Sequence, residues 1–432
     1  MNAKAFGQSD RKKAVVRRVA VIDLSRKFAR EQKIILGHLT YSASKLWNVA
    51  NYTFREEGVP LKRLCSHLKT HFWYKNLHSQ SAQAVIQSLE AAWKGHFKRP
   101  NGPDNRPPGY QPKDGHFPVR WKKAGFKFVS KGGEMFVRLS LSRQTRAYLM
   151  ERHGIGSDYL WVEMPKSLPF DPRAVQEIEI VPHRFAGDGE IYYVMHVIYR
   201  KEVRTGATDG KSRRWMAIDP GVVNFATCVA EGVPEALIVS GRYVLSMLRW
   251  WNKKRAGLQS VYAKQGVKGS KCLSRMSIRR RNFMRDFVHK AAKEVLGFAL
   301  ANGVTDIAVG DLPKRVVNSD IGHVNNQKLH QLPLGRFVDV LEYQASEVGI
   351  RVHRNVDEHR TSETCSVCGE VRPANRIKRG LWRCKTCGIV LNADVNAARN
   401  ILQKVSPSPV RDRASGFGRP RRIRVPCAST SA

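Results

Sequence analysis

The stretch WMAIDPGVVNFATCVA (Trp215–Ala230) contains two short apolar runs on either side of a Pro-Gly turn. The first run, Trp215–Asp219, ends on an acid. Short apolar runs bounded by turn residues predict buried strands, so the segment predicts two consecutive strands with Asp219 at the end of the first. An acid at a strand end is often only a turn residue. Its role therefore depends on which other side chains reach the same edge.

The sequence after this segment alternates between apolar runs and helical periodicity. Further strands are predicted at Ala236–Gly241, Asp306–Asp311 and Ile350–Val356. Helices are predicted at about 243–265, 277–301, 334–348 and 393–404. Strands that alternate with helices are typical of an α/β domain.

The N-terminal half has a different pattern. A half-buried strand is predicted at Ala14–Asp23, helices at 30–57 and 81–97, and strands through most of 120–205. Residues 99–118 hold six Pro and three Gly and predict a long loop. We favour one β-domain interrupted by a helical insert, and two separate N-terminal domains is the alternative that stays open.

The net charge of the chain limits the classes of partner that it could bind. The 432 residues include 75 Lys and Arg against 36 Asp and Glu, a formal net charge of +39. A field of this size favours a polyanionic partner, because it destabilises a compact chain that has none. Basic residues run through every segment, which argues against a single basic tail on a neutral core. No apolar run of membrane-spanning length is present, so we expect no membrane association.

Four of the eight cysteines fall within a 23-residue window as two CxxC pairs. The spacing predicts one Zn²⁺ held by four thiolates, a closed site that is structural and not catalytic. Gly369 and Gly388 follow the second cysteine of each pair, where such a knuckle often needs positive φ. The alternatives are chance spacing or redox-active pairs. The predicted ligands are Cys365, Cys368, Cys384 and Cys387.

A further acid, Asp394, begins the last predicted helix in NADVNAARNIL (Asn392–Leu402). Taken alone, it could be a helix N-cap. An acid on the first strand, acids after later strands and an acid on the final helix are together the layout of a two-metal nuclease. Such a site needs carboxylates around two Mg²⁺ about 4 Å apart.

Four motifs, AIDPGVVNFAT (Ala217–Thr227), TSETCSVCG (Thr361–Gly369), WRCKTCG (Trp382–Gly388) and NADVNAARNIL, resemble the RuvC-like nuclease core of TnpB proteins. These are transposon-encoded, RNA-guided DNA endonucleases related to type V CRISPR effectors. The resemblance is specific over about 210–404 and rests only on layout before that.

The resemblance implies a multi-domain α+β fold: a wedge-type β-barrel with a helical recognition insert, then an RNase H-like core with an inserted zinc ribbon. The implied divisions are an N-terminal arm and first wedge strand at 1–29, a helical recognition lobe with its linker at 30–119, the rest of the barrel at 120–210, the nuclease core at 211–360, the zinc ribbon at 361–391, the final core helix at 392–404 and a basic disordered tail at 405–432.

The sequence departs from the family at one functional position. The family usually has a glutamate where this chain has Gly310, followed by Asp311. Asp311 is the weaker substitute, because a shift of one residue along a strand points the side chain to the other face. Glu358 follows the next predicted strand, which the family fold places beside Gly310, and some members carry their glutamate relocated in this manner. Asp357 is its nearest competitor, and a solvated loop acid is the bland alternative for Glu358 itself.

We therefore expect Asp219, Glu358 and Asp394 to bind two Mg²⁺ in an RNA-guided endodeoxyribonuclease. The implied partners are a guide RNA and double-stranded target DNA with a short adjacent motif. A nuclease-dead DNA binder and a compact type V effector are alternatives, and a guide-free transposase or accessory protein is a third. We expect a monomer in the cytoplasm of a prokaryote, associated with its nucleoid. The predicted helix at 243–265 carries Trp and Lys side chains suited to nucleic acid, although solvated helix faces with core Trp explain any single residue better.

Overall fold

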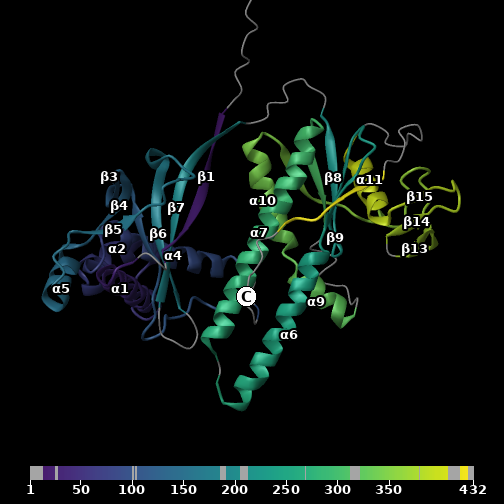
Figure 1. Cartoon of the computed structure of the whole chain (residues 1–432). Coiled ribbons are helices and arrows are strands. Elements are labelled where there is room, and N and C mark those ends of the chain that lie inside the picture. The colour runs from purple at the N-terminus through teal and green to yellow at the C-terminus, as the bar shows by residue number, and fades with distance from the viewer. Residues whose placement is uncertain are drawn as a thin grey trace, which may run out of the picture. The chain divides into compact units, whose positions relative to one another are not determined.

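The computed structural model describes residues 13–24, 28–99, 102, 105–184, 191–204, 213–267, 269–311, 322–378, 380–406 and 419–426. The described residues form two compact units, one between Val15 and Lys201 and the other from Glu202 onward. Each unit has its own hydrophobic core, and Figure 1 draws the helices and strands of both. The N-terminal arm, residues 1–12, lies outside the described residues.

The N-terminal unit contains two sheets. The first has the strand order β1-β7-β6-β2 and consists of β1 (Lys13–Asp23), β7 (Ile191–Arg204), β6 (Val175–Arg184) and β2 (Val119–Lys122). The second is an antiparallel sheet of β3 (Phe126–Lys131), β4 (Glu134–Ser140) and β5 (Tyr159–Glu163). Because β1 lies beside β7, strands from both sides of the helical segment share one sheet.

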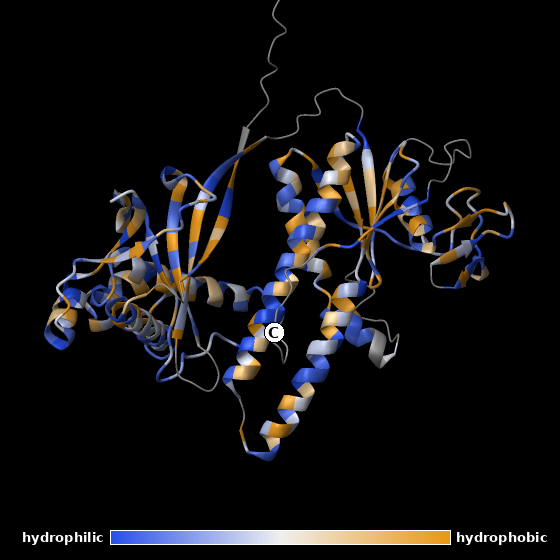
Figure 2. Ribbon diagram, in the orientation of Figure 1, coloured by the Kyte–Doolittle hydropathy of each residue, from blue (hydrophilic) through white to orange (hydrophobic). Residues whose placement is uncertain are grey.

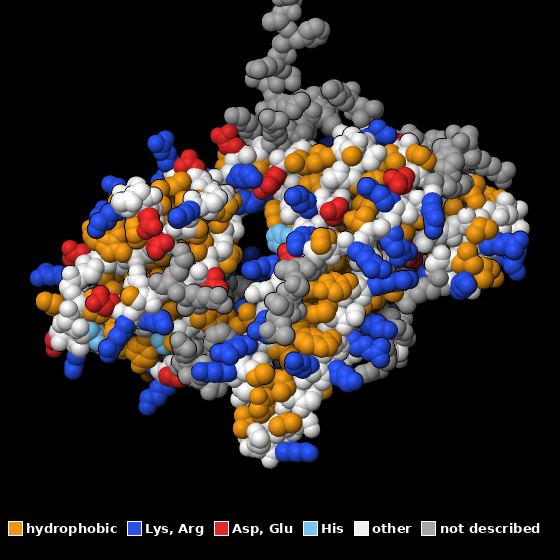
Figure 3. Space-filling view, in the orientation of Figure 1, with side chains coloured by type: hydrophobic (Ala, Val, Ile, Leu, Met, Phe, Trp, Pro, Cys, Tyr) orange, Lys and Arg blue, Asp and Glu red, His pale blue; other side chains and the backbone are white. Residues whose placement is uncertain are grey.

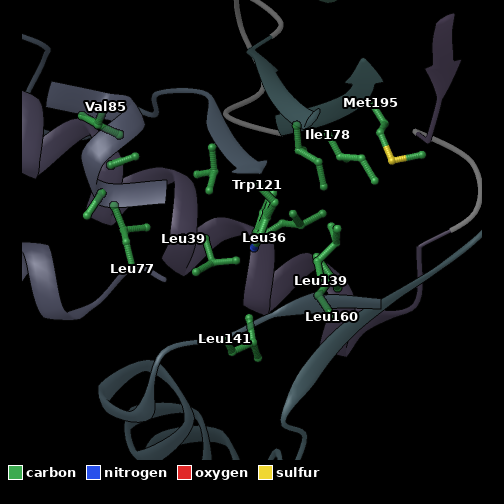
Figure 4. Close-up of a cluster of buried hydrophobic side chains, with 14 of the residues drawn as sticks. Leu36, Leu39, Leu77, Val85, Trp121, Leu139, Leu141, Leu160, Ile178 and Met195 are labelled. Atoms are coloured by element: carbon green, nitrogen blue, oxygen red, sulfur yellow. The ribbon is translucent and has the colours of Figure 1, made fainter. Parts of the chain in front are cut away.

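The helical segment of this unit consists of α1 (Arg30–Arg55), α2 (Leu64–His67), α3 (Phe72–Lys75) and α4 (Ser79–Phe97). Their apolar sides join the same core as the strands, where Leu36 and Trp121 are fully buried (Figure 4). The Pro-rich loop lies along α1, which holds it by side-chain bonds from Trp47 to Gly109 O at 3.0 Å and from Asn51 to Pro108 O at 3.0 Å.

Helix α5 (Arg143–His153) was missed in the region predicted to be strands. Ser142 caps its first turn, with Oγ accepting from Thr145 N at 3.1 Å. Gly154 ends it with φ of 68°. Both signals are typical of helix ends. The strand-like residues on either side of α5 dominated the sequence pattern, so these two helix-end signals were overlooked.

The C-terminal unit is built on a six-stranded sheet with the order β12-β11-β8-β9-β10-β16. Its strands are β8 (Trp215–Pro220), β9 (Asn224–Ala230), β10 (Leu237–Ser240), β11 (Asp306–Gly310), β12 (Arg351–Val356) and β16 (Arg421–Ile423). Strand β11 pairs in parallel with both β8 and β12, and β9 is antiparallel to β8 and β10. The carboxyl ends of β8, β11 and β12 therefore lie at one edge.

Helices cover both faces of this sheet. Met216 and Ile218 pack toward α7 (Lys271–Ala301) and α10 (Leu334–Glu347). Ala217 and Ala308 pack toward α11 (Ala393–Val405) on the opposite face. The inner strands β8 and β9 are buried on both faces and mostly apolar (Figure 2), as strands between two helical layers must be.

Two more helices complete the unit, α6 (Arg242–Lys264) and α9 (His323–Gln331). The predicted helices at 243–265, 277–301, 334–348 and 393–404 are confirmed as α6, α7, α10 and α11, with α7 beginning six residues earlier than predicted. Within the described residues, no helix is both long and apolar enough to cross a bilayer.

The prediction of a disordered tail at 405–432 is wrong for its described part. Arg421–Ile423 forms β16, which pairs in parallel with β10, with Arg421 N donating to Ala236 O at 2.8 Å. Val425 is 4% exposed and joins the core under the sheet. The high Arg and Pro content of this segment favoured disorder in the sequence. The buried residue Val425, two positions after the short strand, was too weak a signal to predict it.

A buried carboxylate fastens the amino-terminal ends of β11 and β12. Asp306 is fully buried, and it accepts from Arg351 Nε and His353 Nε2, each at 2.9 Å, and from Thr305 Oγ1 at 2.8 Å. Burial raises the pKa of Asp306, but these hydrogen bonds outweigh burial and leave the pKa below its ordinary value. The ionised form is therefore stabilised by folding.

We predict that Asp306 makes the stability of this unit acid-sensitive. Its folded-state pKa lies below the unfolded one, so its contribution is present at neutral pH and is lost as the pH falls below about 4. Asp306→Asn should lower the free energy of unfolding by about 1–2 kcal/mol at pH 7 and by much less at pH 3. Urea denaturation at both pH values measures this.

The matched control is Asp286→Asn, which removes a partly exposed carboxylate 2.9 Å from Lys290 within one helix. It should change the free energy of unfolding by less than about 0.5 kcal/mol at either pH. An equal loss for Asp306→Asn at pH 7 and pH 3 would contradict the prediction.

Candidate functional site

The four predicted cysteines come together. All four Sγ atoms lie within 4.8 Å of one another, and Cys365–Cys387 and Cys368–Cys384 are separated by 3.7 Å and 3.6 Å. Each CxxC pair forms a tight turn, closed by Gly369 N to Cys365 O at 2.9 Å and by Gly388 N to Cys384 O at 3.0 Å. Both glycines have the predicted positive φ, 79° and 71°. Four sulfurs at this spacing fit a tetrahedral Zn²⁺.

The cysteine cluster belongs to a small module that α11 holds in place. Its strands are β13 (Arg376–Lys378), β14 (Leu381–Arg383) and β15 (Val390–Leu391), with Trp382 fully buried beneath them. Side chains of α11 bind the first knuckle: Asn396 Oδ1 accepts from Ser366 N at 2.9 Å, and Gln403 Nε2 donates to Ser366 O at 2.6 Å. The module and the sheet thus share one helix (Figure 1).

Asp219 and Gly310 occupy neighbouring positions in the sheet. The parallel register pairs Ala308 with Ala217 and Val309 with Ile218. Continued by one residue, it sets Gly310 beside Asp219 at about the usual 4.8 Å strand spacing. Both follow the parity of Ala217 and Ala308, so both lie on the face that α11 covers.

The Glu358 side chain occupies the space above Gly310. A Cβ at Gly310 would lie 2.8 Å from Cδ and 3.0 Å from Cγ of Glu358 and would overlap its Oε1. A side chain at position 310 and the present position of the Glu358 carboxylate therefore exclude each other. The missing acid on β11 and the acid after β12 are alternative ways to bring a carboxylate to the same place.

A bulge in β12 directs the chain toward this position. Ala308 pairs with His353 but Gly310 pairs with Val356, so β12 contains one residue more than β11. Asn355, within the bulge, has φ of 59°, a conformation that Asn tolerates better than most residues. Beyond the strand, Glu358 O accepts from Thr361 N at 3.1 Å and Thr361 Oγ1 at 2.9 Å, which fixes the following turn.

The two competing acids are placed differently. Asp357 is 75% exposed and pairs with Lys404 Nζ at 3.0 Å, which lowers its pKa, as does the hydrogen bond from His359 N. Asp311 is 9% exposed and its N donates to Val356 O at 3.0 Å. Glu358 is 7% exposed, so it is not a solvated loop acid.

Asp394 contacts Asn224, the residue that begins β9 after the turn following Asp219. Asn224 Nδ2 donates to Asp394 Oδ2 at 2.5 Å, and Arg376 Nη2 lies 3.7 Å from Oδ1. A Cβ at Gly221 would lie 2.6 Å from the carbonyl oxygen of Asn224, so the turn requires glycine there. Asn392 Oδ1, not Asp394, caps α11 by accepting from Asp394 N at 3.0 Å, which excludes the capping role for Asp394.

The three carboxylates approach one edge without forming a tight cluster. Among the described residues, the four cysteines are the group of metal-ligand side chains whose ligand atoms lie within 4.8 Å of one another, and Asp219, Glu358 and Asp394 do not reach that spacing. Ligands that flank two ions about 4 Å apart need not be so close to one another.

Basic and aromatic side chains gather on α6 and α7. Trp250 is 48% exposed with Lys254 Nζ 5.0 Å from its ring centre, whereas Trp251 is buried against Phe283. A groove of about 760 Å³ between these helices is lined by Trp250, Met276 and Arg279 among others. Lys and Arg side chains are also spread over the face of both units drawn in Figure 3.

Two family models match parts of the chain. Residues 196–316 match OrfB_IS605, described as a probable transposase, and residues 335–401 match the TNB domain of Cas12f1-like proteins. These ranges contain Asp219, Glu358, Asp394 and all four cysteines. These parts of the chain are similar in sequence to TnpB-like and Cas12f1 proteins.

Individual proteins of these kinds are also similar in sequence to this chain. The CRISPR-associated endodeoxyribonuclease Cas12f1 of Sulfoacidibacillus thermotolerans is 26% identical over 218 residues, 48% of this chain and 49% of that protein. TnpB-like protein MJ0751 of Methanocaldococcus jannaschii is 27% identical over 156 residues, 36% of this chain and 54% of that protein. The chain thus spans about half the length of the curated relatives it matches.

The fold resembles that of Cas12f1 in a solved complex. The cryo-EM structure of a Cas12f1–sgRNA–target DNA complex aligns with a TM-score of 0.57 and 15% identity, covering 87% of this chain and 83% of that one. At this identity the likeness concerns the mixed α/β fold. It extends across both units, whereas the sequence motifs are confined to the C-terminal half.

We predict that the chain binds one Zn²⁺ through the cysteine cluster. Cys384→Ser should lose the metal and expose β13–β15 to proteolysis, because a four-thiolate site orders its own domain. Elemental analysis of purified protein and limited trypsin digestion measure the two effects. Cys272→Ser, at an exposed cysteine on α7, is the matched control and should change neither. Full metal content in Cys384→Ser would refute the assignment.

Proposed function

We propose that the chain is an RNA-guided DNA endonuclease of the TnpB and type V effector kind, and that Asp219, Glu358 and Asp394 form its catalytic centre. The proposal rests on the position of the Glu358 carboxylate directly over Gly310 of β11, the strand that pairs with the Asp219 strand, β8. Glu358 therefore supplies a carboxylate at the position where this chain has glycine and the family usually has glutamate. The alternative of a nuclease-dead DNA binder is disfavoured by this retention of three acids at one sheet edge.

The sheet order supports an RNase H-like core. Strands β10, β9, β8, β11 and β12 are neighbours in that order, with only β9 antiparallel to its neighbours. We further propose that the two sheets and helical segment of the N-terminal unit serve as wedge and recognition lobe. Their distribution of Lys and Arg suits the backbone of an RNA or an RNA–DNA duplex.

The chemistry of the donors fits hard divalent cations. Asp219, Glu358 and Asp394 offer only carboxylate oxygens, which Mg²⁺ prefers over nitrogen or sulfur. Two Mg²⁺, when bound, would activate a water and stabilise the leaving oxygen of the cleaved phosphodiester. The residues of the chain orient the site: α11 carries Asp394, the end of β8 carries Asp219, and the β12 bulge brings in Glu358. The zinc module has no open ligand position and takes no part in bond cleavage.

The proposal is tested by purifying the full chain from its host, sequencing the RNA bound to it, and incubating the complex with DNA that carries a guide-matched target beside randomised flanks. We expect one discrete RNA and Mg²⁺-dependent cleavage next to a short flanking motif. A preparation without discrete RNA, or cleavage independent of guide matching, would contradict the proposal. A CRISPR repeat array or transposon ends beside the gene would distinguish the two origins.

We predict that Glu358→Ala abolishes cleavage while guide-RNA binding survives, because it removes one of the carboxylates without touching the basic surface. Cleavage of a labelled target and gel-shift of the guide RNA measure the two effects. Asp357→Ala is the matched control, since its carboxylate is exposed and paired with Lys404. It should cleave at nearly the wild-type rate.

A relocation experiment sharpens this test. Gly310→Glu alone should impair the enzyme, because the new side chain collides with Glu358. Combined with Glu358→Ala, the same change should restore part of the cleavage that Glu358→Ala abolishes. Full activity of the Glu358→Ala single variant would refute the assignment, and failure of the double variant would mean that position 310 cannot supply an equivalent carboxylate.

A further inference from the structure

The strand β16 brings an arginine to the candidate site from a part of the chain predicted to be disordered. Arg422 pairs in register with Ile238 of β10, and paired residues of neighbouring strands share a sheet face. Ile238 packs toward α11. Arg422 therefore lies on the face that carries Asp394, whereas Ile423 and Val425 pack into the core on the opposite face.

Arg422 reaches Asp394 through one intermediate side chain. Its Nη1 donates to Asn224 Oδ1 at 2.8 Å, and Asn224 Nδ2 donates to Asp394 Oδ2 at 2.5 Å. Asn224 is 6% exposed at the start of β9, so its amide has few other partners available. The three residues come from β16, β9 and α11, and the sheet fixes the positions of the two strands.

The direction of these hydrogen bonds determines what Asn224 does. A guanidinium only donates, so its contact with one end of the amide must be with the oxygen. That contact turns the NH₂ group toward Asp394, where it can donate to the carboxylate. Without Arg422, the amide could rotate by half a turn and present its oxygen to Asp394, which would repel a carboxylate.

We propose that Arg422 and Asn224 are positioning residues for Asp394, and that β16 is therefore a working part of the catalytic centre. Arg422 sets the orientation of the Asn224 amide, and the amide holds Asp394 Oδ2. The other oxygen, Oδ1, lies 3.7 Å from Arg376 Nη2 and is the one that would bind a cation. This inference rests on the proposed function for the role of Asp394, but the hydrogen-bonded chain itself does not.

The first test measures metal binding without activity. Mn²⁺ affinity of the full-length protein, freed of nucleic acid, is determined by electron paramagnetic resonance, with Asp394→Ala defining background binding. Arg422→Ala should weaken the site-specific Mn²⁺ affinity about 10- to 100-fold, the usual effect of losing a group that orients a metal ligand. Arg422→Lys, which retains a positively charged donor on a shorter side chain, should recover part of it. Arg421→Ala, at the neighbouring exposed arginine, should bind like wild type.

The second test measures DNA cleavage by the guide complex against Mg²⁺ concentration. Arg422→Ala should need a higher Mg²⁺ concentration for half-maximal cleavage and should approach the wild-type rate at saturation. A purely structural role for β16 would instead lower the rate at every Mg²⁺ concentration. Thermal unfolding of each variant verifies that the sheet remains folded.

Asn224→Leu provides a variant of similar size in case Arg422→Ala does not fold. It removes both hydrogen bonds of the amide without adding charge, and should weaken Mn²⁺ binding at least as much as Arg422→Ala does. Adding Arg422→Lys to it should change affinity little, because the amide that Arg422 orients is gone. If wild type cleaves no guided DNA, the proposed function fails while the Mn²⁺ comparison still decides the role of Arg422. Unchanged Mn²⁺ affinity and Mg²⁺ dependence in both Arg422→Ala and Asn224→Leu would overturn the inference.

Discussion

Helix α11 packs on one face of the six-stranded sheet, and the candidate site depends on this packing. Val395, Ala398 and Ile401 bury its apolar side against Ala217, Ala308 and other residues of that face, each worth about 1–3 kcal/mol. The same helix carries Asp394 in its first turn and binds the cysteine module through Asn396 and Gln403. A slip of one turn, about 5.4 Å, would remove Asp394 from Asn224. Apolar packing therefore sets the position of a polar site.

The relation between Gly310 and Glu358 shows how such a site tolerates relocation of a ligand. Parallel strands end at a common edge, so an acid one strand away can reach the place that an acid on β11 would occupy. Two conditions must hold together: position 310 must lack a side chain, and β12 must be bulged so that the chain turns back over β11. A glutamate at 310 with Glu358 retained would violate the first condition, because the two side chains would overlap. Gly310 is therefore required for Glu358 to occupy its position, because any larger residue there would overlap the Glu358 side chain.

The sequence predicted the periodic parts of the fold well, because buried strands and amphipathic helices leave repeating patterns. The strands β8 to β12 and helices α6, α7, α10 and α11 follow the predicted ranges closely. The cysteine spacing likewise predicted a cluster that the structure brings together. Each of these features depends on residues near one another in the chain.

Features that depend on distant residues were not predictable in this way. Asn224 gave no signal, since its function needs Arg422, which lies 198 positions further along the chain. The β12 bulge is one extra residue whose effect appears only against the register of β11. Strand β16 is three residues long and gains its stability from β10 and the core. Helix α5 is different, because Ser142 and Gly154 marked its ends and were outweighed by neighbouring strand-like residues.

The contacts of the acids explain how a chain of net charge +39 can keep carboxylates available for cations. Asp357 shows the usual outcome, a carboxylate paired with a lysine, which satisfies its charge. Asp394 is held instead at 2.5 Å by the neutral amide of Asn224, with Arg376 more distant at 3.7 Å. An amide orients a carboxylate without neutralising it, so the negative charge remains to attract a divalent ion. Arg422 acts one residue further away, where its positive charge fixes the amide and leaves the carboxylate free of a direct ion pair with it.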